Sequence, residues 1–64
     1  MMTKIEALHE FEVYMHDLRA EASREGYDVD RAQTWDMMVE SWVAEGKISE
    51  ETGKQWIASG PNPG

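Results

Sequence analysis

The sequence predicts an all-α protein, a small domain of three helices. Apolar residues recur at intervals of three and four along most of the chain, and no stretch of useful length alternates as a β-strand does. Gly26 and Gly46 divide the chain into segments of helical length. We therefore expect a single helical domain over residues 1–59, followed by a flexible tail rich in Gly and Pro over residues 60–64.

The first predicted helix runs from Thr3 or Lys4 to about Glu25. Thr3 and Glu6 have the spacing of a capping box, and Gly26 suits the left-handed position that follows a helix end. The apolar residues of this segment share one face, which we expect to be buried: Leu8, Phe11, Met15, Leu18 and Ala22, with Ala7 and Tyr14 at its border.

The second predicted helix runs from Arg31 to about Glu45. Asp30 and Gln33 form a second capping pair, and Gly46 ends the helix. Met37 projects away from the apolar stripe and marks a small exposed apolar spot. The stripe itself follows helical spacing and comprises Ala32, Trp35, Met38, Val39, Trp42 and Val43.

The third predicted helix is short and begins after Ser49. Two glutamates in its first turn complement the positive end of the helix dipole. Gly53 in its interior costs about 1 kcal/mol relative to Ala, so this helix must depend on docking. Trp56 and Ile57 supply its apolar contacts, and we expect Trp56 to be the most exposed of the three tryptophans.

The helix lengths predict how the three elements pack. The first helix spans about 33 Å and the second about 22 Å, so an antiparallel hairpin of the two leaves part of the first uncovered. We expect the uncovered part to be the N-terminal turns, with the third helix turning back to lay Trp56 and Ile57 over Ile5, Leu8 and Phe11.

Composition restricts the function classes. A 64-residue chain buries only about 60% of the surface of its unfolded form, so we expect no deep cleft, no enzyme and no cofactor. The absence of cysteine excludes disulfides and thiolate zinc sites. The longest apolar runs, of three residues, exclude a membrane span. The lack of cysteine and of an apolar signal segment at the start favours the cytoplasm. A net charge of −7 repels nucleic acid and predicts a basic protein partner.

A second, weaker apolar stripe lies on the opposite face of the first helix. One explanation is that the third helix or the tail covers it. The other is an interface, through which two chains form a homodimer as a four-helix bundle or one chain receives a partner helix. We expect self-association through the five residues of this stripe: Ile5, His9, Val13, His16 and Ala20.

Four acidic residues of the first helix fall within about 60° of one another. Like charges four residues apart destabilise a helix by a few tenths of a kcal/mol. Helix stability therefore does not explain why these acidic residues are present. The residues form either a solvated face or an array that binds a basic surface in place of nucleic-acid phosphates. They are Glu6, Glu10, Asp17 and Glu21.

Two other patterns are weaker. His9, Glu12 and His16 could converge on a metal ion, but these three side chains leave most of a coordination sphere unfilled, so we expect no metal. The segment around Gly46 has the outline of a helix-turn-helix. Trp42, however, falls where such a motif needs a small residue, and the acids after Ser49 would repel DNA phosphates.

The sequence thus favours a small acidic, non-enzymatic protein-interaction module. Short acidic helical proteins without motifs are common among the accessory proteins of phages and mobile elements, which by analogy suggests binding of a host factor. The alternative is a self-assembling structural subunit without a heterologous target. A DNA-binding helix-turn-helix is less favoured.

Overall fold

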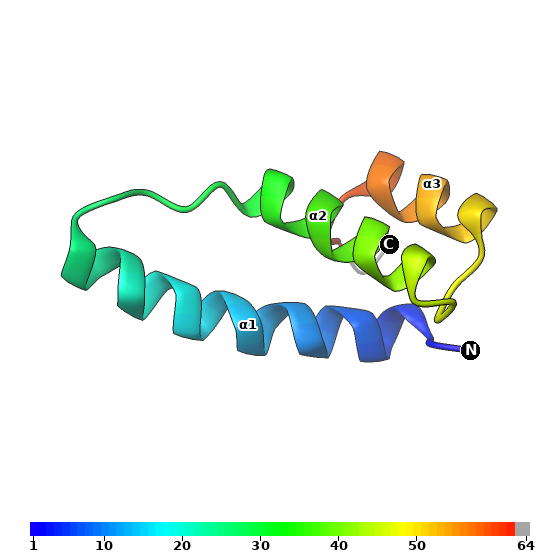
Figure 1. Ribbon diagram of the computed structural model, residues 1–64, viewed down its shortest axis with the longest axis horizontal. Coiled ribbons are helices and arrows are strands. Elements are labelled where there is room, and N and C mark those ends of the chain that lie inside the picture. Colours follow the sequence, from blue (N-terminus) through cyan, green and yellow to red (C-terminus); the bar gives the residue numbers. More distant parts are fainter. Residues whose placement is uncertain (63–64) are drawn as a thin grey trace.

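The computed structural model describes residues 1–62 and contains three helices (Figure 1). They are α1 (Lys4–Glu25), α2 (Arg31–Ala44) and α3 (Glu50–Ser59). α1 and α2 form an antiparallel hairpin, and α3 turns back to pack against α2 (Figure 1). The all-α class and the three-helix order are therefore confirmed.

Local side-chain hydrogen bonds fix both ends of α1. The Glu6 backbone N–H donates to Thr3 Oγ1 at 3.2 Å, and the Thr3 backbone N–H donates to Glu6 Oε1 at 3.1 Å. At the other end Gly26 has a φ of 81°, and its N–H donates to the Ala22 carbonyl at 2.7 Å. The predicted capping box and left-handed glycine are both confirmed.

The other two helices also begin at the predicted caps. Asp30 accepts a hydrogen bond from the Gln33 N–H at 3.0 Å, and Ser49 accepts one from the Thr52 N–H at 3.1 Å. α2 ends at Ala44, one residue earlier than predicted. Ala32 is exposed, so its place in the predicted buried stripe of α2 is wrong.

The chain after α3 stays close to the end of that helix as far as it is described. Gly60 has a φ of 73°, and Asn62 Nδ2 donates to the Ser59 carbonyl at 3.1 Å. The rest of the predicted tail, residues 63 and 64, lies outside the described residues.

The core is built around the indole of Trp35, which has no exposed surface. Its ring centroid lies 5.2 Å from that of Phe11, 5.8 Å from that of Trp42 and 6.3 Å from that of Trp56. Trp56 is the most exposed tryptophan, as predicted, but at 9% it belongs to the core. The buried hydrophobic residues are Ala7, Phe11, Met15, Ala22, Trp35, Val39, Trp42, Ile48 and Trp56.

The prediction that α3 covers the N-terminal turns of α1 is wrong for Ile5. The connection over residues 27–30 has no helical structure and runs back along the last turns of α1 (Figure 1), which shifts α2 toward the start of α1. The Met2 N–H donates to the Lys47 carbonyl at 3.1 Å, so the N-terminus meets the α2–α3 loop. Ile5 is 81% exposed and is not covered by α3.

Candidate functional site

The outward face of α1 carries the second apolar stripe predicted from the sequence. Every member is exposed: Ile5, His9, Val13, His16 and Ala20. The opposite face of the helix packs into the core through Phe11 and Met15. The alternative in which α3 covers the stripe is therefore wrong, and none of residues 60–62 buries it.

The acidic strip, defined as Glu6, Glu10, Asp17 and Glu21, is exposed along its whole length. Within residues 1–62 the salt bridges are Arg31–Glu12 at 2.6 Å and Lys47–Glu45 at 3.2 Å, and neither uses a member of the strip. Hydrogen bonds from the backbone and hydroxyl of Thr3 lower the pKa of Glu6. The strip is thus a row of carboxylates without neutralising partners.

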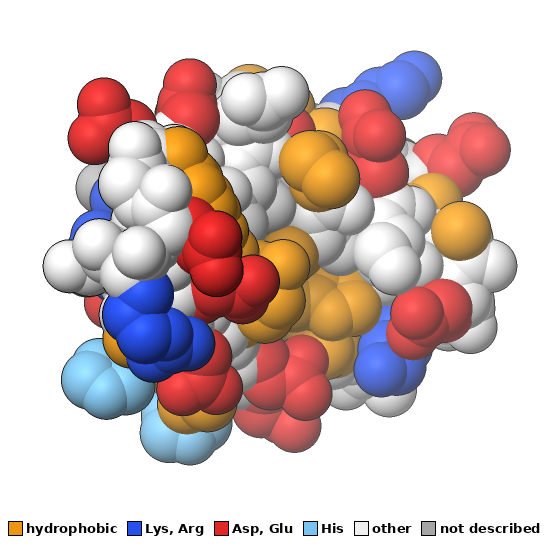
Figure 2. Space-filling view, turned by 60° about the vertical axis from the view of Figure 1, so that its left-hand side comes forward, with side chains coloured by type: hydrophobic (Ala, Val, Ile, Leu, Met, Phe, Trp, Pro, Cys, Tyr) orange, Lys and Arg blue, Asp and Glu red, His pale blue; other side chains and the backbone are white. Residues whose placement is uncertain are grey.

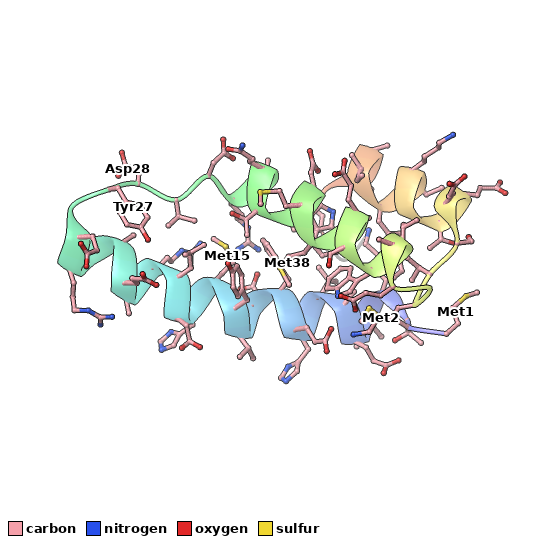
Figure 3. All side chains as sticks on the ribbon, in the orientation of Figure 1. Met1, Met2, Met15, Tyr27, Asp28 and Met38 are labelled. Carbon is pink, nitrogen blue, oxygen red and sulfur yellow. The ribbon has the colours of Figure 1, made fainter. Side chains whose placement is uncertain are left out.

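A groove that the sequence did not predict runs between α1 and α2. It consists of two adjoining hollows of about 570 and 270 Å³, and Tyr14 and Met38 line both. Figure 3 shows Met15 and Met38 in the space between the two helices. We call this feature the α1/α2 groove and define it by its apolar lining: Val13, Tyr14, Leu18, Met37, Met38 and Trp42. Its α1 edge overlaps the outward stripe, because Val13 and His9 of that stripe also line the larger hollow.

Acidic side chains form the rim of the α1/α2 groove. Glu10 and Asp17 of the acidic strip line it on the α1 side, and Glu45 lines it near the end of α2. Lys47 lies beside Glu45, and hydrogen bonds from Lys47 and Ser41 lower the pKa of that carboxyl. On the face in Figure 2, hydrophobic side chains gather in the middle, and most of the charged side chains around them are acidic. The surface therefore combines apolar area with negative charge.

The structure does not group His9, Glu12 and His16 as the ligands of a metal ion. Glu12 is paired with Arg31, whose guanidinium carbon also lies 4.9 Å from the centroid of the Phe11 ring. This pair ties the middle of α1 to the start of α2. In the part of the chain that the structure describes, no three His, Asp or Glu side chains are grouped as metal ligands would be.

Sequence reasoning placed the acidic strip but missed the groove beside it. Met38 was assigned to the buried stripe of α2, whereas it is half-buried and lines both hollows. Met37, predicted as an exposed apolar spot, is 64% exposed and extends the groove. Val13, predicted in the exposed stripe, and Glu10 and Asp17, predicted in the acidic strip, also line the groove, but the sequence did not indicate that these residues share a site with Met37.

Over residues 1–62, no helix combines the length and the apolar character that crossing a membrane requires. No protein-family model, curated protein or solved structure matches this chain.

Proposed function

We propose that this chain is a non-enzymatic protein-binding module whose partner is a basic protein. The observation that carries the proposal is the acidic strip, which is exposed and forms no salt bridge within residues 1–62. Carboxylates one turn apart repel one another, and a basic surface would relieve that repulsion. The net charge of −7 would also steer a basic partner toward the chain.

Self-association is the second candidate, and the outward stripe of α1 supports it. Ile5 and Val13 are 81% and 53% exposed, and pairing two chains through α1 would remove both from water in a four-helix bundle. The acidic strip runs beside the stripe, however, so such a pairing brings like charges together. We therefore favour a heterologous partner over a second copy.

Charge reversal of Glu10, Asp17 and Glu21 to Lys should abolish binding of the basic partner while the helical fold remains. All three side chains are exposed, so the change alters the electrostatic potential of the surface and leaves the core packing intact. The measurement is a tagged pull-down from nuclease-treated lysate of the source cell. We expect the wild type to retain a basic protein at low salt and release it at high salt.

The matched control reverses three exposed acids elsewhere, Glu25, Asp28 and Glu40, and so makes the same change in net charge. We expect this control to retain the partner more strongly than the strip variant does. Equal retention by both variants would mean that the acidic strip is only solvated. Recovery of the bait alone would favour the self-assembling subunit.

Replacement of Val13 by Glu tests the second candidate. If two chains pair through α1, sedimentation should show a wild-type dimer and a monomeric variant, because a carboxylate in the seam would be buried without a partner. Ala32→Glu, an exposed position on α2, is the control and should sediment as the wild type does. A monomeric wild type at micromolar concentration would exclude the seam.

A further inference from the structure

We infer that the α1/α2 groove is the docking site for a basic amphipathic helix of about three turns. This inference rests on the proposed function, in which the partner is basic, and adds where that partner binds and what shape its binding segment has. The apolar lining supplies the sites in which apolar side chains of the guest helix are anchored, and the acidic rim favours a guest that is positively charged.

The lining has the properties of a helix-binding groove. Val13, Tyr14 and Met37 are each about half exposed or more, so apolar surface remains open to solvent in the free chain. Two packed helices present such a groove to the apolar face of a third. Methionine side chains adapt to different apolar partners because they are unbranched and flexible, and Met37 and Met38 lie at adjacent positions here.

The geometry sets the length and conformation of the guest. Along α2 and its C-cap the lining runs from Thr34 to Glu45, which at 1.5 Å per residue is about 16 Å, or three helical turns. Both walls are helices whose backbone groups are already hydrogen-bonded internally, so they offer no sheet edge to an extended peptide. A guest that satisfies its own backbone groups as a helix fits these walls.

Charge complementarity identifies the chemistry of the guest. Glu10 and Asp17 form no salt bridge within residues 1–62, and Lys47, the lysine of the lining, already lies 3.2 Å from Glu45. Lys or Arg residues flanking an apolar stripe would pair with these carboxylates. A second copy of this chain would instead bring its own net charge of −7 against them.

The test uses two designed peptides of about 14 residues without tryptophan. Both carry Leu at helical i, i+4, i+7 and i+11 spacing. One has Lys at the flanking positions and the other has Glu at the same positions. Binding is followed by tryptophan fluorescence and by amide chemical shifts of the labelled protein. We expect the Lys peptide to bind at least tenfold more tightly, with the largest shifts at Tyr14, Met38 and Trp42.

Two double variants locate the binding site. Tyr14→Ala with Met37→Ala removes apolar lining and should weaken binding of the Lys peptide at least fivefold. Ile5→Ala with Tyr27→Ala also removes two exposed apolar side chains, neither of which lines either hollow of the groove, and should leave binding unchanged. Circular dichroism of both variants verifies that they remain helical.

The possible failures are distinguishable. If the Lys peptide binds but the Tyr14/Met37 variant binds it equally well, the groove is not the docking site, although a basic partner remains the proposed function. If both peptides bind equally, or neither binds, the inference is overturned. Groove shifts that grow with protein concentration alone would assign the groove to a second copy and also overturn it.

Discussion

Replacing Trp35 with Ala should remove a large part of the chain's free energy of unfolding at neutral pH and room temperature. Trp35 has no exposed surface and contacts the rings of Phe11, Trp42 and Trp56, so the change empties the centre of the core. Such a truncation costs about 3–5 kcal/mol. At about 0.05–0.15 kcal/mol per residue, the whole chain has only about 3–10 kcal/mol of stability. Far-ultraviolet circular dichroism during urea unfolding measures the loss.

The milder change Trp35→Phe separates the hydrogen bond of this residue from its packing. Trp35 Nε1 donates to the buried carbonyl of Trp56 at 2.8 Å and so joins α2 to the end of α3. Trp42→Phe is the matched control, because the Trp42 ring nitrogen makes no hydrogen bond within residues 1–62. We expect Trp35→Phe to lose about 1 kcal/mol more than the control. Equal losses would mean that the indole hydrogen bond adds no stability.

The helix boundaries were predictable because their causes are local in the sequence. Thr3 with Glu6, Asp30 with Gln33, and Ser49 each meet their hydrogen-bond partner within three residues. Such a cap depends on the identity of one or two side chains and not on how the helices pack. The three starts were therefore found from residue spacing alone.

The placement of α2 along α1 was not predictable in this way. It depends on the path of the connection over residues 27–30 and on how the rings of Phe11, Trp35 and Trp42 fit together. Neither leaves a periodic signal in the sequence. For this reason the exposure of Ile5, which follows from the shifted placement, contradicted the expected covering by α3.

The same distinction separates the parts of the candidate site. The acidic strip belongs to one helix, so helical periodicity was sufficient to place its residues on a common face. The α1/α2 groove needs two helices at a particular offset, with Tyr14 from one and Met38 from the other. A stripe analysis of each helix alone assigns Met38 to the core and misses its second role.

Gly53→Ala should destabilise the chain although Ala is the better helix former by about 1 kcal/mol. The sequence indicated only the helix-propensity cost of this glycine. The structure shows that the missing side chain allows α3 to approach α2 closely. A Cβ at position 53 would lie 2.6 Å from Val43 Cγ2 and 3.6 Å from Val39 Cγ1. Valine in a helix strongly prefers one rotamer, so Val43 cannot easily turn aside. Overpacking of this kind costs about 1–3 kcal/mol, which exceeds the propensity gain over most of that range.

A double-mutant cycle with Val43→Ala tests this explanation directly. Removing the methyl groups of Val43 takes away the nearest atoms to the new Cβ, so Gly53→Ala should become neutral or stabilising in that background. Urea unfolding of the four proteins gives the coupling between the two positions, which we expect to exceed about 1 kcal/mol. If Gly53→Ala stabilises the wild type, then α3 can move away from α2 at little cost. The close approach at Gly53 would then not be what fixes the position of α3 on α2.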